Sequence, residues 1–132
     1  MTARVLVGAV ALVALAWLGV MERDLVLQER GAGALRPGSS AADLARAETD
    51  LERARLLNPD PAPDVNLALL HRARGEPARA LAAIEAVVRR EPDNLMAWAT
   101  LAVLARGEDH AAVARADAAR LRLDPLNARR SR

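Results

Sequence analysis

The chain has 132 residues and a formal net charge of +2, and it contains no Cys, Tyr, Phe or Lys. Without Cys it has no disulfides, no thiol nucleophile and no cysteine-ligated metal site. Acidic residues are interspersed among the arginines and stacking aromatics are absent, so the composition predicts no nucleic-acid partner. With so few aromatics, any core must be helical, thin and closely packed.

The first predicted element is an uncharged run, Val5–Met21, preceded by Arg4. As a helix it spans about 25 Å, at the short end for a bilayer core of about 30 Å. Trp17, near its far end, suits a membrane interface. We therefore predict a membrane anchor helix over residues 1–21. A signal peptide cleaved near Ala14-Leu15-Ala16 and a buried core helix are the alternatives.

The membrane orientation has two competing indications. Counting basic residues, Arg4 stands against Arg23, Arg30 and Arg36, which favours a cytoplasmic carboxyl side. A short basic start before an apolar run, as in signal anchors, favours export of that side. We expect a single-pass protein of the bacterial inner membrane, with the remaining chain outside the cytoplasm.

Residues 22–59 are predicted to form an irregular first unit. Its first helix is expected over residues 22–36 and abuts the apolar run, so the two can form one rod; a loose linker over residues 31–40 is the alternative. Pro37-Gly38 makes a turn, and Ser39 or Ser40 is the expected N-cap of the next helix.

A repeat of thirty-three residues follows, marked by Pro59, Pro92 and Pro125. Apolar residues stand at equal offsets before the first two prolines: Ala47, Leu51 and Ala54, then Ala80, Ile84 and Val87. Spacings of four and then three place each triplet on one helical stripe, and the proline ends the helix. In the last unit the helix over residues 110–123 shows either Ala112, Ala116 and Ala119 or Ala114, Ala118 and Leu121, and both choices stay open.

Each unit also has a predicted first helix. Asp60 and Pro61 are expected to cap and start the helix that includes residues 65–74, and Gly75 to end it as the C′ residue. Leu67, Leu70 and Arg74 mark one side of this helix, and Leu69 the other. The pairs Leu67-Ala68 and Leu101-Ala102, and the triplets Arg74-Gly75-Glu76 and Arg106-Gly107-Glu108, recur between the units.

These residues resemble the tetratricopeptide repeat, a helix–turn–helix unit of about thirty-four residues. The matching positions are Leu67, Ala68, Gly75, Ala80, Ile84 and Pro92, then Trp98, Leu101, Ala102, Gly107 and Pro125. His71 and Ala105 depart from the aromatic that the family has at their position. The resemblance implies an all-α solenoid of about three units over residues 22–126 (22–59, 60–92 and 93–125), preceded by one transmembrane helix and followed by a basic tail over residues 127–132.

No catalytic set of residues is apparent. His71 falls at a packing position, and His110 lies in a turn beside Glu108 and Asp109, where a solvated turn is expected rather than a metal site. No serine lies in a nucleophile motif, and no glycine-rich phosphate loop occurs. We predict a protein without enzymatic activity, cofactor or metal.

The resemblance implies a concave groove lined by the first helix of each unit. The implied groove residues are Val65, Leu69, Arg72, Ala73, Ala99, Val103 and Arg106. Val65 and Leu69 stand where carboxylate-clamping family members have Lys and Asn, so we expect no such clamp. The groove suits an amphipathic helix or an extended segment. The alternative is that these residues pack against their own neighbours.

These features predict a membrane-anchored scaffold or adaptor in a bacterial cell envelope. Protein partners would bind the groove or the uncapped last helix, and Val5–Met21 would enter the membrane. The layout resembles repeat tails of O-antigen-type polysaccharide polymerases and ligases, and envelope assembly factors. The alternatives are a periplasmic adaptor or chaperone released by signal cleavage, and a small structural subunit of a membrane complex.

Overall fold

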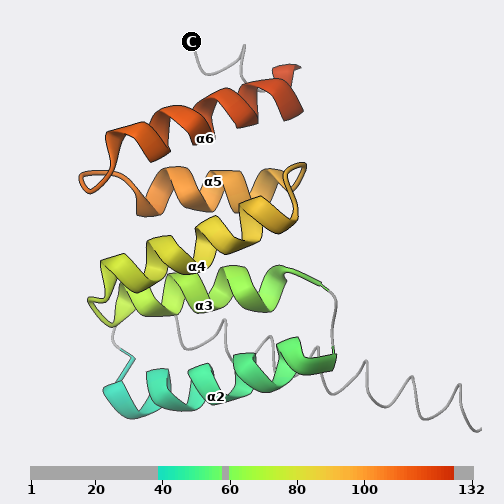
Figure 1. The fold of residues 1–132 in the computed structure, drawn as a ribbon. Helices are drawn as coiled ribbons and strands as arrows, with labels where there is room; N and C mark the ends of the chain where they lie inside the picture. The colour runs from blue at the N-terminus through green and yellow to red at the C-terminus, as the bar shows by residue number, and fades with distance from the viewer. Residues whose placement is uncertain (1–38, 58–59, 127–132) are drawn as a thin grey trace, which may run out of the picture.

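The computed structural model describes residues 39–57 and 60–126, in which the helices stack one upon another (Figure 1). They are α2 (Ala41–Leu57), α3 (Ala62–Ala73), α4 (Pro77–Arg90), α5 (Leu95–Leu104) and α6 (His110–Leu123). Every element in these ranges is an α-helix, which confirms the predicted all-α fold for this part of the chain.

The helices pair with their neighbours along the chain. α3 packs on α4 and α5 on α6, giving two helix–turn–helix units, while α2 packs on α3 and α4 on α5. α3 also touches α5, so the first helices of the two units lie side by side. The helix predicted over residues 22–36, which would pair with α2, lies outside the described residues, as does the choice between rod and linker.

Polar caps set the helix starts. The hydroxyl of Ser40 accepts the N–H of Asp43 at 3.2 Å, and the Asp43 carboxylate accepts the Ser40 N–H at 3.1 Å. This reciprocal pair makes Ser40, rather than Ser39, the N-cap of α2. Asn94 and Asp109 are the N-caps of α5 and α6, and the side chain of each accepts the N–H of the residue three positions later.

The start of α3 corrects one prediction. The helix begins at Ala62, so Pro61 is the N-cap residue and not the first helical one. Asp60 still satisfies an N–H of the first turn, because its carboxylate accepts the N–H of Ala62 at 2.8 Å. At the other end of α3, Gly75 follows the C-cap with φ of +75°, the left-handed conformation expected of a C′ glycine.

The predicted stripes form the core. All six residues of the first two triplets are at most 3 % exposed: Ala47, Leu51, Ala54, Ala80, Ile84 and Val87. In α6 the structure decides between the two alternatives. Ala112 and Ala116 are fully buried, whereas Leu121 is 45 % exposed, so the stripe that begins at Ala112 faces α5.

α3 divides the core into two clusters, as its two-sided sequence predicts. Leu67 and Leu70 pack with Ala47 and Leu51 of α2. The other cluster joins Val65 and Ala68 of α3 to buried residues of α4, α5 and α6. An ion pair between Arg74 and Glu48 closes the α2 side at the end of α3. α3 is therefore the central element of the described chain.

The described helices do not include the predicted membrane helix. Across residues 39–57 and 60–126, no helix has the length and apolar character needed to cross a membrane. The predicted anchor, Val5–Met21, lies outside these ranges, as does the basic tail over residues 127–132.

Candidate protein-binding surfaces

Two of the predicted groove residues belong wholly or partly to the core. Val65 is 7 % exposed and packs in the cluster with α4, α5 and α6. Leu69 is half-buried against the same cluster. Val65 is therefore corrected from a groove residue to a core residue, because the side of α3 that bears it faces α4 and α5.

The accessible residues form one stripe on each first helix. On α5, Val103 is 58 % exposed and Ala99 is half-buried. Met96, which the sequence analysis missed, belongs to the same stripe and is 67 % exposed. The spacing of three and then four residues from Met96 through Ala99 to Val103 is the signal that could have revealed it. On α3, Ala73 is exposed beside the half-buried Leu69.

We call Leu69, Ala73, Met96, Ala99, Val103 and Arg106 the α3–α5 surface. Two arginines lie at its charged edge: Arg106, which belongs to the surface, and Arg72, which lies beside it. The Nη1 atom of Arg72 lies 3.4 Å from the Oε1 atom of Glu108, which ties α3 to the turn before α6. Arg106 is exposed and takes part in none of the ion pairs found among residues 39–57 and 60–126. The α3–α5 surface is thus apolar, with one guanidinium available at its end.

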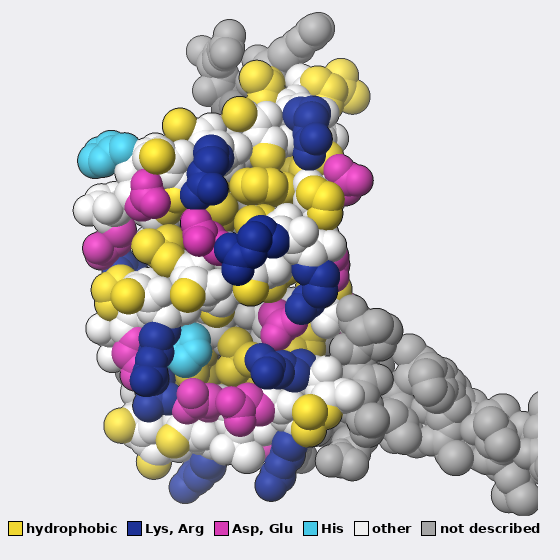
Figure 2. Space-filling model, viewed as in Figure 1, with side chains coloured by type: hydrophobic (Ala, Val, Ile, Leu, Met, Phe, Trp, Pro, Cys, Tyr) yellow, Lys and Arg dark blue, Asp and Glu magenta, His cyan; other side chains and the backbone are white. Residues whose placement is uncertain are grey.

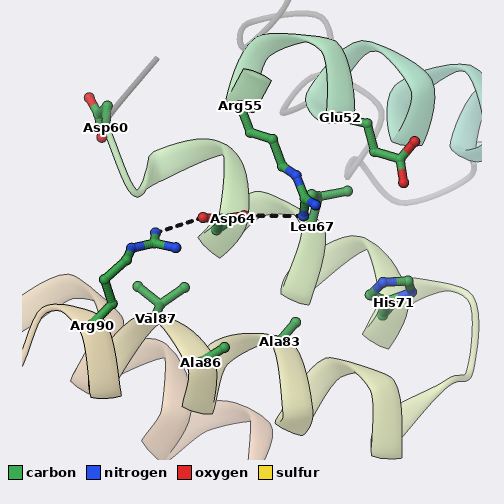
Figure 3. A pocket seen from close by; sticks show the side chains of 10 residues that line it. All are labelled: Glu52, Arg55, Asp60, Asp64, Leu67, His71, Ala83, Ala86, Val87 and Arg90. Carbon is green, nitrogen blue, oxygen red and sulfur yellow. Dashed lines mark hydrogen bonds and ion pairs between the residues drawn. The ribbon is translucent and has the colours of Figure 1, made fainter. Parts of the chain in front are cut away.

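A second feature is a hollow of about 620 Å³ between α2 and α4, with α3 behind it (Figure 3). We call it the α2–α4 hollow. In Figure 2 it lies on the visible face, where charged side chains surround apolar ones. Its lining residues are Glu52, Arg55, Asp60, Asp64, Leu67, His71, Ala83, Ala86, Val87 and Arg90.

Asp64 organises the charges of this hollow. Its Oδ2 atom accepts a hydrogen bond from Arg90 Nη2 at 2.7 Å, and its Oδ1 atom lies 3.5 Å from Arg55 Nη1. Figure 3 shows the two guanidinium groups approaching Asp64 from α2 and from α4. The hydrogen bond with Asp64 raises the pKa of Arg90, and the nearby Glu91 adds to the increase. One carboxylate therefore joins three helices.

His71 lines the opposite end of the hollow and is engaged within the chain. Its Nδ1 atom lies 2.9 Å from Glu76 Oε2, across the turn between α3 and α4. This hydrogen bond lowers the pKa of Glu76, and Arg74 and Arg79 lower it further. The interaction fastens the turn that Gly75 makes, so His71 acts through a hydrogen bond at the hollow, whereas the sequence placed it at a packing position.

The described residues bring together few groups suited to metal binding. His110 is exposed at the first position of α6. Over residues 39–57 and 60–126, no three His, Asp or Glu side chains are arranged to hold a metal ion. What these ranges offer is surface: the α3–α5 surface and the α2–α4 hollow.

One comparison with known proteins is informative. A family model described as "Tetratricopeptide repeat" matches residues 61–104, which span α3, α4 and α5. No curated protein and no solved structure matches the chain. The family match and the paired helices together support a tetratricopeptide repeat in this segment, and with it a protein–protein interaction scaffold.

Proposed function

We propose that the protein is a membrane-anchored scaffold of a bacterial cell envelope that binds an amphipathic segment of a partner protein at the α3–α5 surface. The observation that carries the proposal is the stripe on α5, where Met96 and Val103 are 67 % and 58 % exposed with Ala99 between them. Large apolar side chains that share one exposed stripe favour a partner that covers them.

The chemistry of the surface favours a helical partner with apolar residues on one face. Such a helix places side chains at intervals of three and four residues, and these can lie along Leu69, Ala99 and Val103. Covering Met96 and Val103 contributes about 1.5–3 kcal/mol for each side chain that becomes fully buried. Arg106, which has no ion pair among the described residues, suits an acidic residue on the partner.

The anchor part of the proposal rests on the sequence alone. Val5–Met21 would cross the inner membrane once and hold the helical units outside the cytoplasm. In this proposal the protein has no catalytic role and acts through the partners it holds together. A cleaved, periplasmic adaptor is the second candidate, supported by Ala14-Leu15-Ala16 in the apolar run.

Site-specific photo-crosslinking in native cells tests the surface. A photoreactive residue at position 103 should capture a defined partner, and Met96→Asp in the same chain should abolish the capture. A photoreactive residue at position 56 is the matched control, because Leu56 is 76 % exposed but lies on α2. Equal capture from positions 56 and 103, or capture that survives Met96→Asp, would contradict the proposed surface.

Membrane fractionation tests the anchor separately. The full-length protein should stay in the membrane pellet after a high-salt wash and should keep its first residues, as mass spectrometry can show. Release into the soluble periplasmic fraction with a shortened amino terminus would replace the anchor with the cleaved adaptor. This result would leave the α3–α5 surface untouched, so the two parts of the proposal fail independently.

A further inference from the structure

The α2–α4 hollow lies on the other side of α3 from the α3–α5 surface. Asp64, Leu67 and His71 line the hollow, whereas Leu69 and Ala73 belong to the α3–α5 surface. At 100° per residue, the two groups point in roughly opposite directions from the helix axis. An occupant of the hollow would therefore differ from the partner proposed above.

An internal comparison explains why the hollow is open. Because Leu67-Ala68 and Leu101-Ala102 are equivalent, Asp64 occupies in α3 the position that Trp98 occupies in α5. Trp98 packs against the core cluster, and its indole N–H donates to the carbonyl of Pro92 at 2.8 Å. Asp64 instead binds Arg55 and Arg90. At this position the third unit therefore has a large packed side chain, and the second unit does not.

The lining of the hollow suits an apolar side chain accompanied by basic groups. Leu67, Ala83, Ala86 and Val87 supply an apolar floor beside the charged residues. Asp64 already engages both guanidinium groups. Glu52, by contrast, enters none of the ion pairs of the described ranges, which leaves a negative charge at the edge of the floor.

The chain itself contains a segment of this chemistry. Leu126, just beyond α6, is 76 % exposed, and Arg129, Arg130 and Arg132 follow it in the sequence. We infer that the α2–α4 hollow of one copy binds residues 126–132 of a second copy, with Leu126 against the apolar floor and the arginines beside Glu52.

The placement of the two parts makes this a contact between copies. α2 and α6 lie at opposite ends of the helical stack (Figure 1), so a hollow beside α2 and a segment after α6 meet when copies align head to tail. Such an interface joins different patches on the two partners, and it can continue into chains of copies.

Sedimentation of the full-length protein in detergent micelles tests the contact. The mean mass should rise with protein concentration, and Leu126→Asp should weaken the association roughly tenfold or more, because a charge replaces the leucine that the contact would bury. Leu56→Asp is the matched control, since Leu56 is also 76 % exposed and does not line the hollow. A mass that stays at one copy at all concentrations, or equal effects of the two substitutions, would overturn the inference.

A peptide titration locates the binding site. A fluorescent peptide of residues 124–132 should bind the full-length protein, and Ala86→Trp, which fills the hollow, should abolish binding while circular dichroism stays helical. Glu52→Arg should weaken binding of this peptide, and a peptide with Arg129→Glu and Arg130→Glu should restore it. Peptide binding that Ala86→Trp leaves unchanged, or a charge exchange that restores nothing, would show that residues 126–132 do not occupy this hollow.

Discussion

Asp64 of α3 and Trp98 of α5 occupy equivalent positions in successive units but stabilise the fold in different ways. The Asp64 carboxylate accepts a 2.7 Å hydrogen bond from Arg90 and lies at the edge of the α2–α4 hollow. The Trp98 ring packs on the core, and its N–H donates to the carbonyl of Pro92. The same repeat position thus provides an ionic link in one unit and apolar packing in the next.

This difference predicts unequal effects of the two alanine substitutions. Trp98→Ala should lower the free energy of unfolding by about 2–3 kcal/mol, because it removes a large packed side chain and one hydrogen bond. Asp64→Ala should cost about 1 kcal/mol or less, since water can solvate Arg55 and Arg90, whose side chains are 52 % and 54 % exposed. Urea denaturation measures both, and a greater loss for Asp64→Ala would contradict the assignment.

The burial of Ala80 predicts that stability depends strongly on the size of the side chain at this position of the α3–α4 contact. It is 1 % exposed within the core cluster, so Ala80→Leu should lower the free energy of unfolding by about 1–3 kcal/mol through overpacking. Ala83→Leu is the control, because the half-buried Ala83 lines the α2–α4 hollow, where added volume meets open space. Thermal denaturation should show a clear shift for the first variant only, and equal shifts would refute the proposed packing.

The backbone conformation of Gly75 predicts that a substitution there lowers stability even though the new side chain meets no steric clash. Its φ of +75° disfavours any residue with a Cβ atom, yet an added Cβ would meet no atom within 4 Å. Gly75→Ala should therefore lower the free energy of unfolding by about 1 kcal/mol. Gly75→Asn should cost less, since Asn tolerates this conformation better. Denaturation curves in which Gly75→Ala matches the unchanged protein would exclude this role.

The lowered pKa of Glu76 predicts that the protein loses stability in acid. Its pKa is held below the ordinary value by the hydrogen bond from His71 and by Arg74 and Arg79. A carboxyl group whose pKa is lower in the folded state favours folding above its ordinary pKa of about 4.3, and this contribution is lost as pH falls through the lowered value. Stability measured from pH 6 to pH 2 should fall less steeply in Glu76→Gln. Parallel curves for the two proteins would rule out the linkage.

α6 is predicted to be the least stable helix of the two complete units. Its buried residues are Ala112 and Ala116, whereas α4 buries Ala80, Ile84, Val87 and Val88. Alanine removes little apolar area from water, so α6 gains less free energy from packing. In amide hydrogen exchange on dilute protein, residues 110–123 should exchange before residues 77–90. Equal protection of the two helices in the monomer would disprove the prediction.

Most helix ends could be predicted from the sequence because they depend on chemistry within a few residues. Ser40 and Asp43 cap α2 through mutual hydrogen bonds, and Gly75 supplies the positive φ after α3. The regular stripes were predictable for the same reason, since spacings of three and four residues place side chains on one face of a helix wherever the helix lies. The repeat and its all-helical class follow from these local signals.

Only the tertiary structure decided which faces meet and which stay open. The helical period alone allowed two stripes in α6, and the packing of α5 selects the one that begins at Ala112. Val65 was expected to line the groove, but its side chain is buried, because α4 and α5 approach that side of α3. The α2–α4 hollow is lined by residues of three helices, among them the ion-paired Arg55, Asp64 and Arg90. Such contacts join residues far apart in the chain, so their geometry exists only once the helices have packed.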